Sequence, residues 1–203
     1  MSYREFSLAK VKKAFNLSIE EKVDIYANIP ELECSQLLAE TLSYNVPLAL
    51  AISTEKARSE MIVTPILIEV RRQLQSKFSL FSGVEFTVDS QKGLNGFCDF
   101  IISGSIEQFF VSAPVMMLVE AKNDDIKSGL GQCVAEMYAA QLFNQQEENQ
   151  IETVYGAVTT GSIWQFLQLS ENSISIDQSE YYLSNVNRIL GILANSISTS
   201  LSK

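Results

Sequence analysis

The feature of this sequence that most constrains its fold is an unbroken apolar run, Val115-Met116-Met117-Leu118-Val119, which ends in Glu120-Ala121-Lys122. A strand with one face in water alternates apolar and polar residues. Five apolar residues in succession therefore predict a strand that is buried on both faces, at the centre of a sheet covered by helices. Side chains two residues apart on a strand point to the same face, so Glu120 and Lys122 are expected together at its end.

The segments around this run predict a mixed α/β arrangement. A helical stretch is expected from about Thr54 to Lys77, with Pro65 bending or splitting it. The strands and helices expected after it are Val84–Asp89, Leu94–Ser103, Val115–Lys122, a helix over Asp124–Asn144, strands Thr153–Thr159 and Ile163–Leu169, and a final helix over Leu183–Ile197. The order of helix, three strands, helix and two strands predicts a mixed central sheet flanked by helices.

The first 53 residues predict an N-terminal helical appendage. Ser18-Ile19-Glu20-Glu21 has the pattern of a capping box, which predicts a helix to about Asn28. Pro30 then separates a second helix, from about Glu31 to Tyr44. No repeat or Pro/Gly-rich linker interrupts the chain, so one domain over residues 1–203 is expected. It would consist of the appendage (1–53), a core (54–170) and a C-terminal extension of strand and helix (171–203).

The composition excludes several kinds of chemistry, because the sequence contains no histidine. Without it there is no Ser-His-Asp or Cys-His nucleophile, and the usual zinc sites are excluded as well. The three cysteines, Cys34, Cys98 and Cys133, are widely spaced among apolar residues, which favours reduced, buried thiols. Any bound metal must be held mainly by carboxylate and carbonyl oxygens, which suits Mg²⁺, Mn²⁺ or Ca²⁺.

The charge of the chain limits how it could contact nucleic acid. The net charge is −9, which argues against a protein that coats nucleic acid. All but two of the 15 basic residues precede residue 128, the exceptions being Arg188 and Lys203. A nucleic-acid face would therefore draw on the first 127 residues, although scattered solvating charges explain the same pattern. No apolar segment is long enough for a membrane span and none resembles a signal peptide, so a cytoplasmic location is expected.

Asp99 is the polar residue that stands out in the second expected strand, Gly96-Phe97-Cys98-Asp99-Phe100-Ile101-Ile102. A buried charge in an apolar strand is unfavourable unless a partner compensates it. A metal ion, a structural ion pair or a hydrogen bond to a nearby turn would each do so. The Glu-x-Lys pattern alone means little, since Glu20-Glu21-Lys22 repeats it. Its place at the end of a buried strand, together with Asp99, gives it weight.

Three further polar residues could join this group from the neighbouring helices. Glu60 lies on the long helix before the sheet. Gln132 and Glu136 lie one turn apart on the helix after Lys122, so they share a face. Plain solvation of a helix surface is the alternative role for each of the three.

Together these residues resemble the PD-(D/E)XK nuclease superfamily, whose restriction-endonuclease-like core is a helix, three strands, a helix and a strand. Asp99 matches the first acidic ligand of that family, and Glu120-Ala121-Lys122 matches its (D/E)-x-K motif. Glu60 matches an acid that many members carry on the first core helix, and Gln132 matches a glutamine that some carry on the second. The similarity covers about residues 54–170 and is greatest to small bacterial members. One departure is Cys98, which stands where the family name has proline.

The resemblance implies hydrolysis of DNA phosphodiester bonds with Mg²⁺ or Mn²⁺. Asp99, Glu120 and the carbonyl of Ala121 would hold one ion, and Glu60 would bind a second ion or bridge through water. Lys122 would orient water or offset phosphate charge, with Gln132 beside it. We also consider a homodimer, because cutting both strands of a duplex requires two sites, and we expect no nucleotide cofactor. Two alternatives stay open: a non-cleaving nucleic-acid-binding or regulatory protein with the same fold, and a structural domain whose polar residues satisfy one another.

Overall fold

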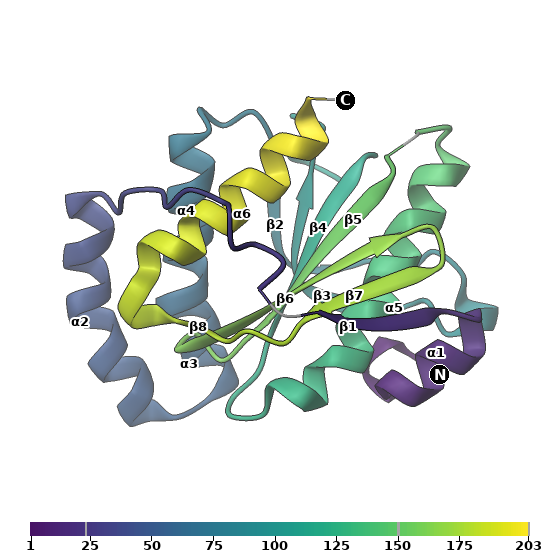
Figure 1. Ribbon diagram of the computed structural model, residues 1–203, viewed down its shortest axis with the longest axis horizontal. Coiled ribbons are helices and arrows are strands. Elements are labelled where there is room, and N and C mark those ends of the chain that lie inside the picture. Colours follow the sequence, from purple (N-terminus) through teal and green to yellow (C-terminus); the bar gives the residue numbers. More distant parts are fainter. Residues whose placement is uncertain (23, 150, 203) are drawn as a thin grey trace.

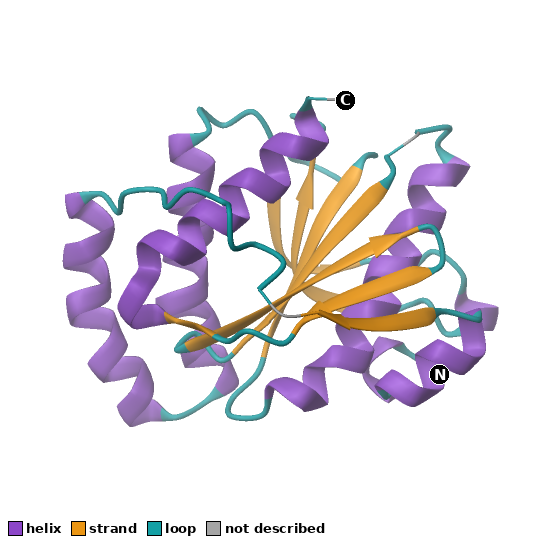
Figure 2. Ribbon diagram, in the orientation of Figure 1, coloured by secondary structure: helices purple, strands orange, loops and turns teal. Residues whose placement is uncertain are grey.

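The computed structural model describes residues 1–22, 24–149 and 151–202, and it is an α/β structure around one mixed sheet. Its strands are β1 (Ser18–Lys22), β2 (Ser79–Glu85), β3 (Phe97–Ser103), β4 (Val115–Ala121), β5 (Thr153–Thr159), β6 (Ile163–Ser170), β7 (Ser173–Asp177) and β8 (Tyr181–Tyr182). Its α-helices are α1 (Leu8–Phe15), α2 (Gln36–Ile52), α3 (Glu55–Arg58), α4 (Thr64–Gln73), α5 (Ile126–Gln146) and α6 (Val186–Leu201). Helices α2, α4 and α6 cover one face of the sheet, and α1 and α5 cover the other (Figures 1 and 2).

Strand β4 lies inside the sheet, whose order is β1-β7-β6-β5-β4-β3-β2 with β8 beside β6. It pairs parallel with β5 and antiparallel with β3. All seven of its residues are buried. Val119 belongs to the apolar cluster under α4 and α6, whereas Leu118 belongs to the cluster under α5. The expected central strand, buried on both faces, is therefore confirmed.

Helix α5 is held along β4 at both ends, which fixes the part of the molecule where the polar residues gather. Near its end, Asn144 donates to the carbonyl of Val115 at 2.8 Å and accepts the N–H of Val115 at 2.7 Å. Near its start, a Cβ on Gly129 would come within 2.7 Å of Val158 and 3.1 Å of the Lys122 side chain. Only a glycine at position 129 lets the first turn of the helix lie this close to the end of β4.

The helical stretch before the sheet is not split at Pro65, but its hydrogen-bonding pattern changes just before that residue. Helix α3 is followed by a π-helical segment, Ser59–Val63, and then by α4, which has Pro65 in its first turn. Proline has no N–H to donate, so the first turn of a helix tolerates it. Helix α4 ends at Gln73, earlier than the expected Lys77.

Strand β2 corrects the expected boundaries of the first strand. It covers Ser79–Glu85 instead of Val84–Asp89, and its pairing with β3 runs from Ser79–Ser103 to Glu85–Phe97. Buried Phe81 lies inside this strand, and Asp89 bridges to Leu94 in the connection that follows. The strands β5 and β6 lie where they were expected, and the 171–203 extension holds β7, β8 and α6.

The N-terminal region is not a helical appendage. The helix expected from Ser18 to Asn28 is wrong, because Ser18–Lys22 forms β1, which pairs parallel with β7 at the edge of the sheet. Helix α1, which was not expected, packs on α5, where the rings of Phe15 and Tyr138 stack with centroids 4.3 Å apart. The second helix begins later than expected, at Gln36, where Ser35 caps it, and it continues to Ile52.

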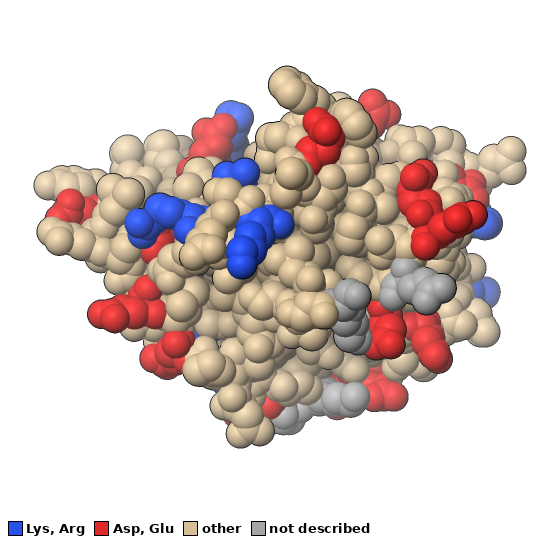
Figure 3. All heavy atoms as spheres, turned by 90° about the horizontal axis from the view of Figure 1, so that it is seen from above, with Lys and Arg blue, Asp and Glu red and all other residues tan. Residues whose placement is uncertain are grey.

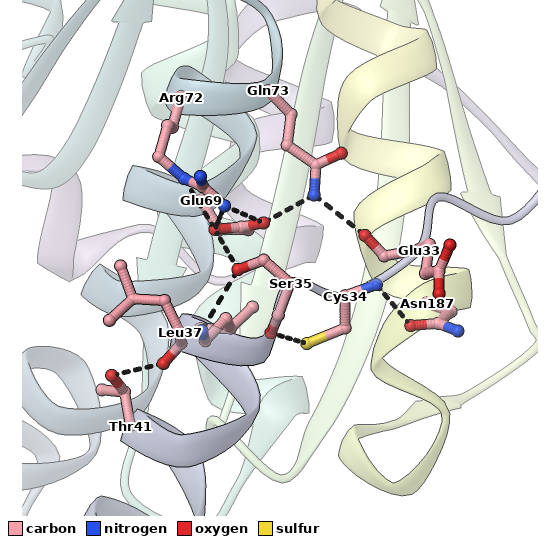
Figure 4. Close-up of polar contacts among 10 residues, drawn as sticks. Glu33, Cys34, Ser35, Leu37, Thr41, Glu69, Arg72, Gln73 and Asn187 are labelled. Atoms are coloured by element: carbon pink, nitrogen blue, oxygen red, sulfur yellow. Dashed lines mark hydrogen bonds and ion pairs between the residues drawn. The ribbon is translucent and has the colours of Figure 1, made fainter.

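A cluster of polar side chains fixes the start of α2 against α4 (Figure 4). The buried carboxylate of Glu69 accepts hydrogen bonds from Ser35 at 3.1 Å, Gln73 at 2.6 Å and Arg72 at 2.9 Å. Burial alone would raise the pKa of Glu69, but these hydrogen bonds lower it below its ordinary value. Both oxygens have donors, so this buried acid has a structural role.

The expectation of buried, reduced cysteines is met by two of the three. Cys98 and Cys133 are buried free thiols, as expected, whereas the free thiol of Cys34 is half-buried.

Across residues 1–22, 24–149 and 151–202, no helix has the length and apolar character needed to cross a membrane. Figure 3 shows one face of the molecule, on which Lys and Arg side chains gather toward the left, while Asp and Glu lie around the rim and are densest on the right.

Candidate active site

The candidate site lies where the pairing of β3 with β4 ends. The last paired residues are Phe100 and Val119. Beyond them, one carboxylate oxygen of Asp99, Oδ2, accepts the backbone N–H of Ala121 at 2.8 Å. The side chain of Asp99 thus replaces a main-chain acceptor at the end of β4, beside Glu120. The compensating partner expected for this charge is, in the structure, a hydrogen bond to the neighbouring strand.

Glu120 and Lys122 lie together, as the strand alternation predicted. The ammonium of Lys122 donates to Oε1 of Glu120, and the two form an ion pair. The Glu120 side chain is only 1% exposed, and its second oxygen, Oε2, has no hydrogen-bond partner among the described residues. A buried carboxylate oxygen without a donor is unfavourable, so its presence in a fold calls for an explanation. It is the clearest place in this group for a cation.

Two side chains from α5 extend the group. Lys122 donates to the side-chain oxygen of Gln132 at 3.4 Å, and the amide nitrogen of Gln132 donates to Glu136 at 3.0 Å. Gln132 and Glu136 therefore share a face of the helix, as predicted, and both are buried. Because Glu136 accepts from the amide nitrogen, the amide oxygen of Gln132 faces Lys122. The chain Glu136–Gln132–Lys122–Glu120 holds the ammonium in one position.

The residues of the first helix lie differently from the expectation. Glu60 lines an open cleft of about 320 Å³ that also contains Asp99, but it is exposed and pairs with Lys56 at 2.7 Å. Glu55 lines the same cleft, and its carboxylate lies 3.9 Å from the ammonium of Lys122. The helix acid nearest to the lysine is thus Glu55, which the sequence analysis missed.

The sequence gives little indication that Glu55 belongs to the site. Residues five apart on a regular α-helix point about 140° away from each other. Glu55 and Glu60 nevertheless line the same cleft, Glu55 from α3 and Glu60 from the π-helical segment that follows it. The sequence marks Glu55 only as an acid after the helix-capping Thr54. That signal indicates a helix start and gives no direction for the side chain.

Burial and like charge shift the protonation of the two buried acids in the same direction. Burial first, and then the negative charge of Asp99, raise the pKa of Glu120 to about 8, against the opposing effect of Lys122. Burial, and then the charge of Glu120, raise the pKa of Glu136 well above its ordinary value. Burial would lower the pKa of Lys122, but Glu120 raises it above the ordinary value, so the ammonium stays charged.

These shifts predict that the metal-free protein loses stability as the pH rises. An acid whose pKa is higher in the folded chain binds its proton more tightly there, so folding is favoured below the unfolded pKa. For Glu120, that stability is complete below about pH 4.5 and is lost as the pH rises through about 8. In EDTA, the melting temperature should fall across this window, and Glu120→Gln should flatten the fall. If the melting temperature of Glu120→Gln fell with pH as steeply as that of the wild type, the raised pKa would not belong to Glu120.

The donor set is compatible with a hard divalent cation. In the described part of the chain, no three His, Cys, Asp or Glu side chains group closely enough to hold a metal ion by themselves. Mg²⁺, however, is usually held by one or two carboxylates and keeps several waters. Asp99, the unpartnered oxygen of Glu120 and the carbonyl of Ala121 supply donors of the right kind. The residues therefore fit such an ion.

No family model, no curated protein and no solved structure matches the chain. The candidate site stands on the sequence pattern and on the geometry of its residues.

Proposed function

We propose that the chain is a metal-dependent nuclease that hydrolyses DNA phosphodiester bonds at the end of β4. The observation that carries the proposal is the meeting of Asp99, Glu120 and Lys122 there, with one buried oxygen of Glu120 unpartnered. The order of elements supports it. Helix α4 precedes the antiparallel strands β2, β3 and β4, and α5 then leads to β5, which is parallel to β4. The same order is the one expected above for a restriction-endonuclease-like core, which supports the proposal.

The side chains divide the chemistry among them. Asp99, Glu120 and the carbonyl of Ala121 would hold Mg²⁺ or Mn²⁺, which when bound would polarise the phosphate and acidify a water. Lys122 cannot be a ligand while protonated, because an ammonium has no lone pair. Held by Glu120 and Gln132, it would place its positive charge against the negative charge that develops on the phosphate. Glu55 and Glu60 line the cleft where further water or a second ion would be held.

The second candidate function is a non-cleaving nucleic-acid-binding or regulatory protein that keeps the nuclease fold. The net charge of −9 favours it, as does the scarcity of basic residues after residue 127. A duplex-binding surface normally neutralises several phosphates with Lys and Arg. A homodimer with two clefts is the form in which the nuclease could cut both strands of a duplex.

Metal binding should be visible as a gain in stability. Without a cation, Glu120 ionises only against burial and the negative charge of Asp99, which is why its pKa is raised to about 8, and a bound cation would offset that unfavourable charge. Millimolar Mg²⁺ or Mn²⁺ should therefore raise the melting temperature. At a metal concentration a hundred times the dissociation constant, the free energy of unfolding should rise by about 2.7 kcal/mol. Asp99→Asn and Glu120→Gln should each remove this response.

The control for this experiment is Asp124→Asn, which alters an exposed acid next to the same strand end. It should keep the full response to the metal. A wild type with neither a thermal shift nor heat of metal binding in calorimetry would mean that the polar group is purely structural.

A further inference from the structure

Phe97 is an exposed aromatic residue on the strand that carries Asp99. The other residues of β3 are buried or half-buried, whereas the Phe97 side chain is 59% exposed. Residues two apart on a strand project to the same side, with their Cα atoms about 7 Å apart. The Cα atoms of Phe97 and Asp99 are separated by one such step. Strict alternation does not hold between them, because Cys98 and Phe100, also two apart, belong to opposite apolar clusters, so the link between Phe97 and the cleft is made by the residues that line both spaces.

A small pocket beside Phe97 adjoins the cleft of the candidate active site. It has a volume of about 240 Å³ and is lined by Ser2, Tyr3, Arg4, Gly96 and Phe97. Arg4 lines both this pocket and the cleft that contains Asp99, so the two are neighbours that share this residue.

The N-terminal segment that forms one wall of this pocket is anchored. The hydroxyl of Tyr3 donates to the carbonyl of Phe86 at 2.8 Å, and its N–H donates to the carbonyl of Asn95 at 3.1 Å. Gly96 has a φ of +137°, and a Cβ there would lie 3.3 Å from the ring of Tyr3. Glycine at this position thus permits both the backbone conformation and the close approach of Tyr3. The anchored Tyr3 in turn holds the backbone of its neighbour Arg4 beside the pocket and the cleft.

We propose that the ring of Phe97 is a stacking platform for an unpaired base of single-stranded DNA whose neighbouring phosphate lies in the cleft at Asp99. The proposal rests on the proposed nuclease function and names its substrate class. The faces of bases in a duplex are covered by their neighbours, so only an unpaired base can lie on the ring. Arg4 is placed to meet the phosphate between the base and the cleft.

The charges around Phe97 favour a base over a phosphate at this position. Glu85 is the cross-strand partner of Phe97 on β2, and it is exposed. Its carboxylate would repel a phosphate placed over the ring, whereas a stacked base is uncharged. Base stacking on aromatic rings also binds a single strand without a basic surface, which suits a chain with a net charge of −9.

The test is the affinity for a fluorescein-labelled 12-residue oligothymidylate, measured by anisotropy in Mg²⁺ with Lys122→Ala as the parent protein, which keeps the cation beside the cleft carboxylates and slows cleavage. Phe97→Ala should weaken binding by about tenfold, the size expected for one stacked base, and Phe97→Trp should restore it. The control is Phe109→Ala. Phe109 is 96% exposed, lines neither the cleft nor the pocket, and should leave affinity unchanged. The fully paired duplex of the same length should bind more weakly and show no dependence on Phe97.

The outcomes separate this proposal from the nuclease function. The platform would be overturned if Phe97→Ala and Phe109→Ala changed the affinity for oligothymidylate equally, or if neither changed it. Cleavage of single-stranded DNA by Phe97→Ala with an unchanged KM would overturn it as well. Binding that depends on Phe97, with no cleavage in any metal, would instead keep the platform and remove the nuclease. Because the Phe97 side chain is largely exposed, Phe97→Ala and Phe97→Trp should both fold, which their melting temperatures would verify.

Discussion

Replacing Lys122 with alanine should reduce metal-dependent DNA cleavage by about 10²- to 10³-fold, the usual effect of removing one group that stabilises developing charge. Metal binding should survive, because the ammonium donates no electron pair to an ion. The thermal shift with Mg²⁺ should equal or exceed that of the wild type, since Lys122 occupies one oxygen of Glu120 in the metal-free protein. Initial rates on a labelled oligonucleotide and melting curves with and without Mg²⁺ measure the two effects separately.

The same variant should be destabilised when metal-free and at high pH. Removing one partner of a buried ion pair typically lowers stability by about 3–5 kcal/mol, because the other charge is left uncompensated. At low pH the effect should be smaller, since Glu120 can take a proton. Lys127→Ala, which alters an exposed lysine in the first turn of α5, is the control for rate and stability. Cleavage that persists in Lys122→Ala would assign the activity to another site or to a contaminant.

Replacing Gly131 with alanine should destabilise the fold by about 3 kcal/mol or more, at the upper end of the usual penalty for overpacking. A Cβ at this position would lie 2.4 Å from the carbonyl oxygen of Phe6 and 2.6 Å from the backbone nitrogen of Leu8. These are main-chain atoms, so they cannot move aside as a flexible side chain would. The melting temperature should fall by roughly 6–12 °C, and limited proteolysis should release the segment before β1.

The direction of this change is informative, because glycine to alanine inside an ordinary helix stabilises a protein by about 0.5–1 kcal/mol. An exposed substitution on the same helix, such as Lys127→Ala, should change stability by no more than about 0.5 kcal/mol. A stabilised Gly131→Ala variant would mean that the N-terminal segment does not pack on α5 in solution. In that case the pocket beside Phe97, which this segment helps to form, would be lost as well.

The parts of the site that the sequence predicted are those fixed by local periodicity. The apolar run before Glu120 defines a doubly buried strand, and alternation along it brings Glu120 beside Lys122. The helical spacing of Gln132 and Glu136 likewise gives their shared face. Each of these relations depends on residues within one element, so composition and spacing were sufficient.

The parts that escaped prediction depend on contacts between distant segments. Ser18–Lys22 has a good capping pattern for a helix, but it pairs with Ser173–Asp177, some 150 residues later, and that pairing outweighs the local preference. Glu55 is far from Lys122 in the sequence, and only the fold brings its carboxylate within 3.9 Å of that ammonium. Phe97 looked like one more apolar strand residue, and only the fold leaves its ring exposed beside the cleft.

The most direct test of the central claim is cleavage of labelled single-stranded, linear duplex and plasmid DNA by the full chain in Mg²⁺ and in Mn²⁺. The site at the end of β4 predicts cleavage of at least one of these substrates, lost in EDTA and lost in Glu120→Gln. Cleavage that is unaffected by Glu120→Gln would contradict the site. A wild type that binds the metal yet cuts none of the three substrates would contradict the nuclease function and leave the regulatory alternative.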